Sequence, residues 1–368
     1  MKCARRKGWR GAGLAMAAVG LAVMLGPAPV PAQAPPRKVT VVFASTNFPV
    51  GTSPANLPKT LGYWQEEGLD VELQGAAGSL PSLQMVLGGK GDVGVVQPIT
   101  LFQMRPKGAK VKAFYTFIRH NWFYPVVLES SPILSIKDLK GKTIGVQSMG
   151  ASMIPFMKLC LAEAGLDPEK DATFVGVGLG AGAAALLHQG KVDALALWSA
   201  QYALMENAGF KLRSFQDIAP LKHMSFAVSY VARDDWIRDN GEVAARLGRG
   251  WAKATLFALT NPEAAVRLHW KVYPQTRAAG DDDPTAMKKA LTELWAGLNF
   301  MRVDTAPSKK WGLTTREEVE AYGKVLVRAK LMEGQPEGAD QYFAPEMIDR
   351  INDFDQAKVI AQARAFKP

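Results

Sequence analysis

Cysteine and histidine are scarce in this chain, whose 368 residues include two cysteines and four histidines. Cys3 lies in an N-terminal stretch that we expect to be removed, so Cys160 would be the one cysteine of the mature protein. A single cysteine excludes an intramolecular disulfide and a cysteine-based metal cluster. The histidines lack metal-ligand spacing, and no serine-hydrolase or metalloprotease motif accompanies them. The sequence therefore predicts no metal site, no catalytic residues and no enzymatic activity.

Long hydrophobic runs are also missing. The apolar run at residues 11–26 has 16 residues, fewer than the roughly 20 that a helix needs to cross a bilayer. It follows five cations without an acid and precedes a small-residue site that ends at Ala34. This order is typical of a secretory signal peptide, so we predict cleavage of residues 1–34 and a soluble periplasmic protein. An uncleaved anchor helix is the alternative, and Arg5-Arg6 leaves the Sec and twin-arginine routes open.

A strong basic excess is absent once the signal peptide is set aside. The formal net charge of the full chain is +10, and the five cations of residues 1–34 account for half of it. No basic stripe or nucleic-acid-binding module remains, so we expect no nucleic-acid partner. A mild positive field suits an anionic or polar small molecule instead. The remaining length favours two domains.

An internal repeat is present. Its members keep the same order in both copies: a strand, a helix end with a Gly-Leu-Asp turn, and a second helix end followed by a buried strand. Corresponding residues lie 97 to 103 positions apart. The paired segments are 38–45 with 141–148, 66–78 with 163–180, and 86–98 with 186–199.

Each copy predicts short apolar strands that alternate with helices, which indicates a parallel-rich sheet flanked by helices. Ligands of open α/β sheets bind beyond the carboxyl ends of the strands, where helix N-termini present free N–H groups. Glycine there lets a ligand approach the backbone closely. We therefore expect Gly75–Ser79 to form one wall of a cleft and residues 177–184 to form the other.

The segments that carry this plan resemble a known family. GYWQEEGLDVEL, MVLGGKGDVGVV, DLKGKTIGV and LLHQGKVDALALW are similar to the nitrate/sulfonate/taurine type of periplasmic substrate-binding proteins, in a superfamily with binders of thiamine-pyrimidine precursors. The resemblance covers residues 38–265. It implies an α/β, two-lobed clamshell of type II that delivers a small-molecule solute to an ABC transporter permease in the inner membrane. Many members have Glu-Pro where this chain has Ser199-Ala200, which leaves the ligand chemistry open.

We predict that lobe 1 comprises residues 35–124 and 224–368, the latter with extra C-terminal helices, and that lobe 2 comprises residues 125–223. The protein is expected to be a monomer. No cofactor is expected, since VGLGAGAA lacks the strict dinucleotide motif. Two alternatives are a binding protein for pyrimidine or thiamine precursors and a fold-related pyrimidine synthase. The resemblance implies a Cys-rich motif for the synthase, which the mature chain does not have.

Polar and aromatic residues at the predicted strand ends suit a small organic anion such as a sulfonate or aromatic acid. Residues 148–152 lead into a helix as a backbone nest for an anionic group, and Trp198 is placed to stack on an organic ligand or to fill the core. Arg119 is either a clamp for the acid or a solvated hinge charge. The predicted ligand-binding residues are Ser45, Thr46, Asn47, Phe48, Ser79, Gln97, Asn121, Trp122, Ser148, Gly150, Ala151, Ser152 and Trp198.

Overall fold

The computed structural model describes residues 35–218, 225–304, 309–332 and 334–367. The predicted signal peptide lies outside the described residues, as do positions 223 and 224 at the predicted second lobe boundary. Residues 36–368 belong to one structural unit, which contains both sheets. A search of its described helices finds none with the length and apolar character that a membrane crossing requires.

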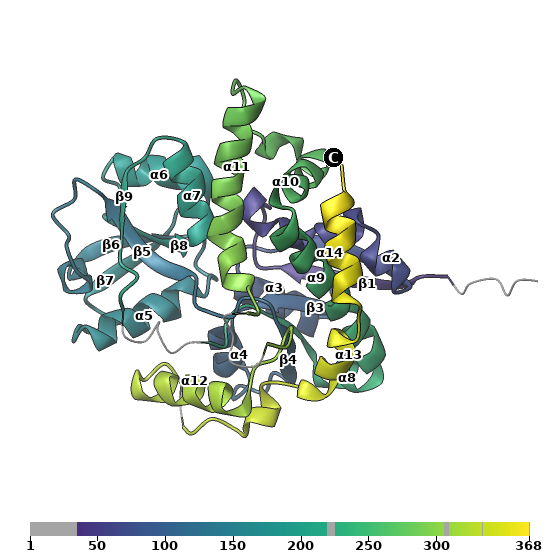
Figure 1. Cartoon of the computed structure of the whole chain (residues 1–368). Coiled ribbons are helices and arrows are strands. Elements are labelled where there is room, and N and C mark those ends of the chain that lie inside the picture. The colour runs from purple at the N-terminus through teal and green to yellow at the C-terminus, as the bar shows by residue number, and fades with distance from the viewer. Residues whose placement is uncertain (1–34, 219–224, 305–308, 333, 368) are drawn as a thin grey trace, which may run out of the picture. The chain divides into compact units, whose positions relative to one another are not determined.

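Five strands form the first sheet, in the order β2-β1-β3-β10-β4 (Figure 1). The first three strands of this order run parallel, whereas β10 is antiparallel to both of its neighbours. Continuous apolar runs such as β3, buried along its whole length, are typical of strands covered on both faces. The strands are β1 (Arg37–Phe43), β2 (Leu69–Gly75), β3 (Val93–Val96), β4 (Val111–Thr116) and β10 (Ser229–Arg233).

The second sheet repeats this arrangement in the order β7-β6-β8-β5-β9. Its first three strands are parallel, and β5 is antiparallel to both neighbours. Two mixed sheets flanked by helices confirm the predicted two-lobed α/β fold. The strands are β5 (Phe123–Leu128), β6 (Lys142–Val146), β7 (Ala172–Gly176), β8 (Ala194–Trp198) and β9 (Leu212–Ser214).

Each copy of the internal repeat contains the same hydrogen bond. In the first sheet the carboxylate of Asp92, just before β3, accepts from the backbone N–H of Thr40 at 2.8 Å. In the second sheet the carboxylate of Asp193, just before β8, accepts from the N–H of Thr143 at 2.8 Å. Both aspartates therefore tie the start of the third strand of their copy to its first strand.

Helices and 3-10 turns flank both sheets. Around the first sheet they are η1 (Val50–Ala55), α1 (Leu57–Thr60), α2 (Tyr63–Glu66), α3 (Ser79–Leu87), α4 (Pro98–Met104) and α8 (Asp234–Asp239). Around the second sheet they are η2 (Ile136–Leu139), α5 (Met153–Glu163), α6 (Gly180–His188) and α7 (Ser199–Asn207). The remaining segments are α9 (Gly241–Thr260), α10 (Pro262–Val272), η4 (Pro274–Thr276), α11 (Asp283–Leu298), η5 (Asn299–Met301), α12 (Arg316–Arg328), η6 (Ala339–Gln341), η7 (Pro345–Met347), α13 (Ile348–Asn352) and α14 (Gln356–Ala365).

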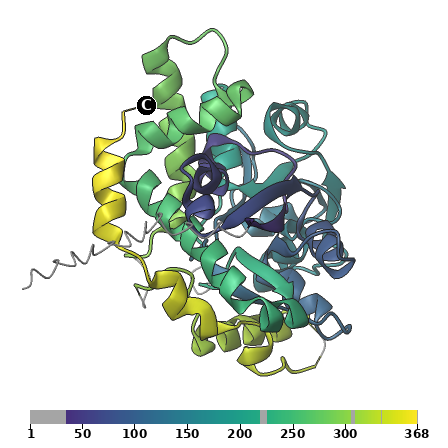
Figure 2. The same ribbon diagram turned by 90° about the vertical axis from the view of Figure 1, so that its right-hand side faces the viewer.

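The chain passes from the first sheet to the second through the short connector 117–122, between β4 and β5, and it returns between β9 and β10. The exact lobe boundaries stay a prediction. The C-terminal helices gather beside the first sheet, as Figure 2 shows with their green and yellow ribbons. The long helix α9 contacts α1, α2, α13 and α14 and carries an apolar face of buried side chains.

Helix α11 contacts elements of both lobes. It packs on η1 of the first lobe and on α7 of the second, and it lies between the two sheets in Figure 1. Its contact with η1 is backbone on backbone: a Cβ atom at Gly297 would overlap the carbonyl oxygen of Gly51. The hydroxyl of Ser199 in α7 donates to the carbonyl of Ala296. This helix therefore braces the two lobes.

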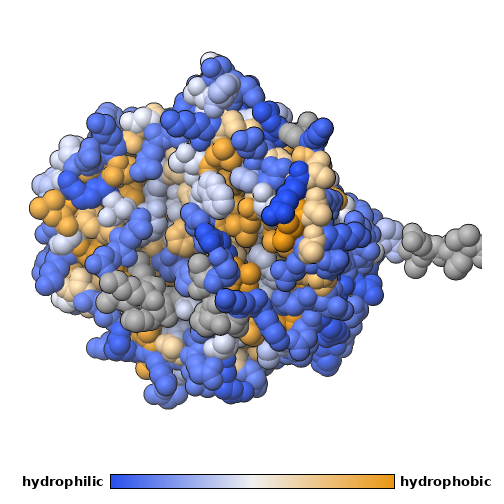
Figure 3. All heavy atoms as spheres, viewed as in Figure 1, coloured by the Kyte–Doolittle hydropathy of each residue, from blue (hydrophilic) through white to orange (hydrophobic). Residues whose placement is uncertain are grey.

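The surface carries few large apolar side chains. Among the described residues, Leu87, Leu134, Met149 and Val272 stand out as exposed. On the face in Figure 3, apolar residues are scattered among hydrophilic ones rather than gathered in one patch.

Candidate ligand-binding cavity

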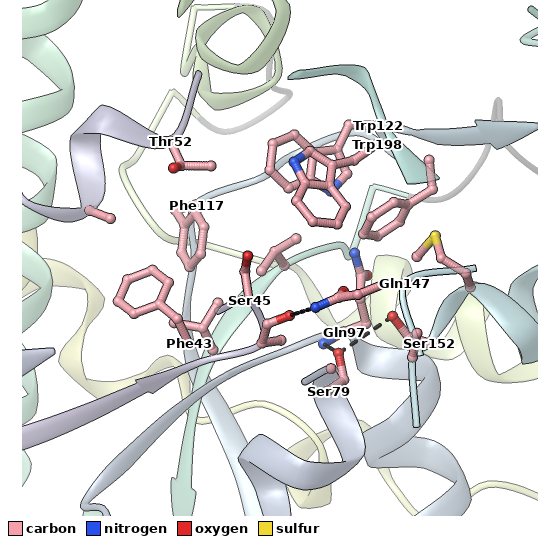
Figure 4. A pocket seen from close by; sticks show the side chains of 18 of the residues that line it. Phe43, Ser45, Thr52, Ser79, Gln97, Phe117, Trp122, Gln147, Ser152 and Trp198 are labelled. Atoms are coloured by element: carbon pink, nitrogen blue, oxygen red, sulfur yellow. Dashed lines mark hydrogen bonds between the residues drawn. The ribbon is translucent and has the colours of Figure 1, made fainter. Parts of the chain in front are cut away.

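A cavity of about 80 Å³ lies where the carboxyl ends of the parallel strands of both sheets meet (Figure 4). Phe43 ends β1 and Trp198 ends β8, and Gln97 and Gln147 directly follow β3 and β6. Pockets for drug-sized ligands span roughly 300–1,000 Å³, so the closed cavity suits a compound smaller than these. Its described lining is Phe43, Ala44, Ser45, Asn47, Phe48, Thr52, Ala55, Gly78, Ser79, Val95, Gln97, Phe117, Trp122, Phe123, Gln147, Ala151, Ser152, Met153, Trp198, Val228, Trp251 and Met301.

Two helix N-termini, one from each lobe, meet at the cavity floor. Ser79 opens α3 in the first lobe, and Ser152 precedes α5 in the second. Their hydroxyl oxygens lie 3.4 Å apart, and the hydroxyl of Ser79 also accepts from the backbone N–H of Gln97 at 3.2 Å. Figure 4 shows these side chains on the side of the cavity opposite Trp122 and Trp198. Helix N-termini carry partial positive charge, so this floor favours an electronegative group.

Direct hydrogen bonds join the lobes beside the cavity. The amide of Gln147 donates to the carbonyl of Ala44 at 3.2 Å, and the hydroxyl of Ser148 donates to the carbonyl of Ala77. The backbone N–H of Leu80 donates to the carbonyl of Gly150 at 3.3 Å. The two glycine-rich turns around residues 78 and 150 are thus in contact, which describes a closed arrangement of the lobes.

Aromatic rings form the remaining walls. Trp122 and Trp198 stack with their ring centroids 6.1 Å apart. On the first lobe, Trp251 lies 6.0 Å from Phe43 and 4.5 Å from Phe117, measured between ring centroids. Large rigid rings of this kind favour a flat, apolar ligand body.

The cavity lining lacks formal charge. None of its described residues is Asp, Glu, His, Lys, Arg or Cys. Within the described ranges, no three metal-ligating side chains gather closely enough to hold an ion. Cys160 is fully buried in α5, and burial raises the pKa of its thiol, which disfavours the reactive thiolate. The arrangement can hold and enclose a molecule with neutral donors and aromatic surface.

The structure brings nine of the thirteen predicted ligand-binding residues together in this lining. They come from six separate segments of the chain and from both lobes. They are Ser45, Asn47, Phe48, Ser79, Gln97, Trp122, Ala151, Ser152 and Trp198. Whether they contact a ligand stays a prediction.

Four predicted residues lie outside the lining. Thr46 is exposed and faces a second hollow. Asn121 donates its amide to the carbonyl of Phe123, two residues away. Ser148 and Gly150 are used in the hydrogen bonds that join the lobes. The nest predicted at residues 148–152 therefore reaches the cavity through Ala151 and Ser152 alone.

The second glycine loop, residues 177–184, does not line the cavity either. The backbone N–H of Gly180, at the start of α6, donates to the side chain of Gln201 at 2.9 Å. A protein side chain thus already partners this helix N-terminus. The wall expected from residues 177–184 is supplied instead by residues 147–153.

Sequence reasoning missed several lining residues. Phe117 and Gln147 directly follow strands β4 and β6, so the strand-end rule that found Gln97 could have found them. Trp251 and Met301 come from the C-terminal helical region, and nothing in the sequence distinguishes their side chains from ordinary core residues.

Arg119 does not line the cavity and is not a solvated hinge charge. Its side chain is 3% exposed, and its charged partner is Glu318 at 3.8 Å. Burial lowers the pKa of Arg119, which Glu318 partly offsets. Arg119 borders a separate space of about 10 Å³, and Phe117 and Met301 stand between this space and the main cavity.

The second hollow, of about 610 Å³, lies between α7, the α10–η4 corner and α11. Its two cations are already paired, Lys289 with Asp281 at 2.9 Å and Arg277 with Asp283 at 3.5 Å. Glu293 in its wall is 5% exposed and accepts a hydrogen bond from the amide of Asn207 at 3.1 Å. Burial raises the pKa of Glu293 to about 7.

Comparison with known proteins agrees with this architecture. Residues 53–265, more than half of the chain, match the family model described as NMT1/THI5 like. The chain belongs to the NMT1/THI5-like family. A putative binding protein of Brucella abortus is 26% identical to this family member over 221 residues, or 59% of this chain and 66% of the relative. The match thus spans slightly less than two thirds of that relative.

A second relative carries the name of an enzyme. A 4-amino-5-hydroxymethyl-2-methylpyrimidine phosphate synthase of Saccharomyces cerevisiae is 25% identical over 233 residues, or 60% of this chain and 66% of the yeast protein. Among solved structures, the alkanesulfonate-binding protein SsuA of Xanthomonas axonopodis pv. citri, bound to MOPS, has a TM-score of 0.63 at 16% identity. The alignment covers 84% of this chain and all of SsuA, which shows the periplasmic binding-protein fold.

Proposed function

We propose that this protein is the extracytoplasmic solute-binding component of an ABC import system. It captures a small organic anion, such as a sulfonate or aromatic acid, between its lobes and delivers it to a permease in the inner membrane. In this proposal the protein is exported, acts as a monomer and performs no chemistry. The ligand favours the closed arrangement because it touches both lobes at once, which is how ligands drive hinge closure.

One observation carries the proposal: the N-termini of α3 and α5, from opposite lobes, converge on one cavity at Ser79 and Ser152. An electronegative group placed there would interact with both lobes. The fold of sulfonate-binding SsuA and the likeness to putative binding proteins support the same reading.

A ligand screen by thermal shift tests the proposal. We expect the mature chain to melt at higher temperature with a sulfonate or an aromatic acid, because a ligand at a hundred times its dissociation constant adds about 2.7 kcal/mol of stability. Pyrimidines serve as the comparison set. If uncharged compounds alone raised the melting temperature, the anion part of the proposal would be wrong. Loss of uptake of the same compound in a strain that lacks this protein would connect binding to import.

The likeness to the yeast synthases favours a second candidate, a pyrimidine-handling enzyme. The two candidates differ in the fate of the bound compound. A binding protein returns its ligand unchanged, so mass spectrometry of the compound recovered after prolonged incubation should show the original mass. A new mass would favour the enzyme.

A further inference from the structure

Asn47 and Phe48 border two spaces at once. They line the cavity of about 80 Å³, and they also line the second hollow of about 610 Å³. The ring of Phe48 packs edge-on against Phe43 at 5.3 Å and stacks on Tyr273 at 5.5 Å, measured between ring centroids. Phe43 lines the cavity but not the hollow, whereas Tyr273 lines the hollow but not the cavity. The Phe48 ring therefore stands between the two spaces.

The hollow behind Phe48 is several times larger than the cavity and has an apolar side. Helices α7 and α11 supply much of that side, through Leu204, Ala208, Ala286 and Ala290. A ligand chain that passed Phe48 would bury methylene groups there, and each buried methylene favours binding. With the ring of Phe48 in place, longer ligands do not gain this burial.

Helix α10 and its end hold the backbone of Phe48 as well as its ring. Nε2 of His269 lies 3.1 Å from the carbonyl oxygen of Phe48, and Nδ1 lies 3.1 Å from the side-chain amide of Asn56. His269 is fully buried, and burial lowers the pKa of its imidazole to about 4. The ring is therefore neutral near pH 7 and carries a single N–H.

The position of this hydrogen follows from the two partners of His269. A backbone carbonyl only accepts, so Nε2 carries the hydrogen and donates to Phe48. Nδ1 is then an acceptor, which the Asn56 amide satisfies when its NH₂ end points to the ring. The NH₂ end of Asn56 has no other partner in its buried site. His269 thus holds the backbone at Phe48 by a hydrogen bond of defined direction.

We propose that Phe48 sets the upper size limit of the solute and that His269 is the positioning residue that keeps Phe48 in place. This inference rests on the proposed solute-binding function and deepens it. The solute is then a small organic anion with a short chain, because a longer chain has to displace the Phe48 ring from between Phe43 and Tyr273. Without that ring, the cavity and the hollow become one larger site.

A series of alkanesulfonates tests the size limit. In isothermal titration calorimetry, the mature chain should bind ethanesulfonate or butanesulfonate more tightly than hexanesulfonate and octanesulfonate. In Phe48→Ala we expect the ratio of octanesulfonate to ethanesulfonate affinity to rise at least tenfold, because the chain then enters the hollow. Phe174→Ala is the matched control, since Phe174 is partly buried like Phe48 but lines neither space.

The outcomes separate the size limit from solute binding itself. If Phe48→Ala kept the chain-length profile of the unmodified protein, the size limit would be wrong and solute binding would stand. The same holds if the unmodified protein bound octanesulfonate most tightly. If no alkanesulfonate bound either protein, the size limit would again be wrong, and the uptake experiment would decide the proposed function by itself.

Two substitutions separate positioning by His269 from its place in the core. The longer amide in His269→Gln can replace the Nε2–H donor to Phe48, whereas the shorter amide in His269→Asn can reach Asn56 alone. Both variants remove a buried ring, so we expect both to melt at lower temperature. We expect His269→Asn to raise the ratio of octanesulfonate to ethanesulfonate affinity and His269→Gln to keep it. Equal ratios in the two variants would overturn the positioning role of His269.

Discussion

Replacing Gly150 with valine is expected to weaken ligand binding by roughly ten- to a hundredfold while the protein stays folded. A Cβ atom at Gly150 would lie 2.9 Å from Cδ of Pro81 on the opposite lobe, and a proline ring cannot rotate away. Overpacking of this kind costs about 1–3 kcal/mol, which here falls on the closed arrangement alone. A ligand that binds the closed form loses affinity in proportion to the population of that form. Calorimetry with the tightest compound of the ligand screen measures the loss.

Gly182→Val is the matched control for this substitution. Gly182 belongs to α6 of the same lobe, and a Cβ atom there meets nothing within 4 Å. We expect the control to bind like the unmodified protein, and both variants to melt near its temperature without ligand. If Gly150→Val bound the ligand with unchanged affinity, the closed arrangement of the lobes would not be the ligand-bound one.

Glu293→Gln is expected to stabilise the protein at pH 8 and to leave it unchanged near pH 4. Burial raises the pKa of Glu293 from its ordinary 4.5 to about 7, so the folded state holds this proton more tightly than the unfolded state does. The contribution of the Glu293 carboxyl to the free energy of unfolding is therefore complete below pH 4.5 and is lost as the pH rises through 7. The difference between the two pKa values of Glu293 corresponds to a loss of roughly 3 kcal/mol in the free energy of unfolding. Glutamine keeps the acceptor for Asn207 and removes the titration.

The measurement is the free energy of unfolding by urea for variant and unmodified protein between pH 4 and pH 8. Glu242→Gln serves as a control of opposite sign. Partial burial raises the pKa of Glu242, but hydrogen bonds and ion pairs with Arg246 and Arg350 lower it overall. This control should be destabilised at neutral pH and approach the unmodified protein as its carboxyl is protonated. A Glu293→Gln variant with the same pH dependence as the unmodified protein would show that Glu293 is hydrated.

The sheets and their repetition could be predicted from the sequence because they depend on local pattern. Continuous apolar strands, and aspartates at matching places before β3 and β8, are visible in the chain itself. The bonds from Thr40 to Asp92 and from Thr143 to Asp193 give those aspartates the same role in both sheets. The strand-end rule likewise placed Gln97 and Trp198 in the lining.

The residues that the prediction misplaced depend on how the lobes approach each other. Ser148 and Gly150 sit at a strand end and a helix start, as expected of ligand-binding residues, but the opposite lobe occupies them. The sequence of one lobe does not encode that encounter locally. Trp251 was missed for a related reason, since an apolar helix face looks the same whether a sheet or a ligand covers it.

The connector 117–122 has a mechanical consequence. Phe117 begins it and Trp122 ends it, and both rings border the cavity. The connector is also anchored on both sides: the N–H of Phe117 donates to the carbonyl of Val228 at 3.1 Å, and the carbonyl of Trp122 accepts from the N–H of Ser199 at 3.1 Å. Bending at this segment tilts one ring relative to the other. A change in the angle between the lobes at this segment would therefore also change the shape of the binding surface.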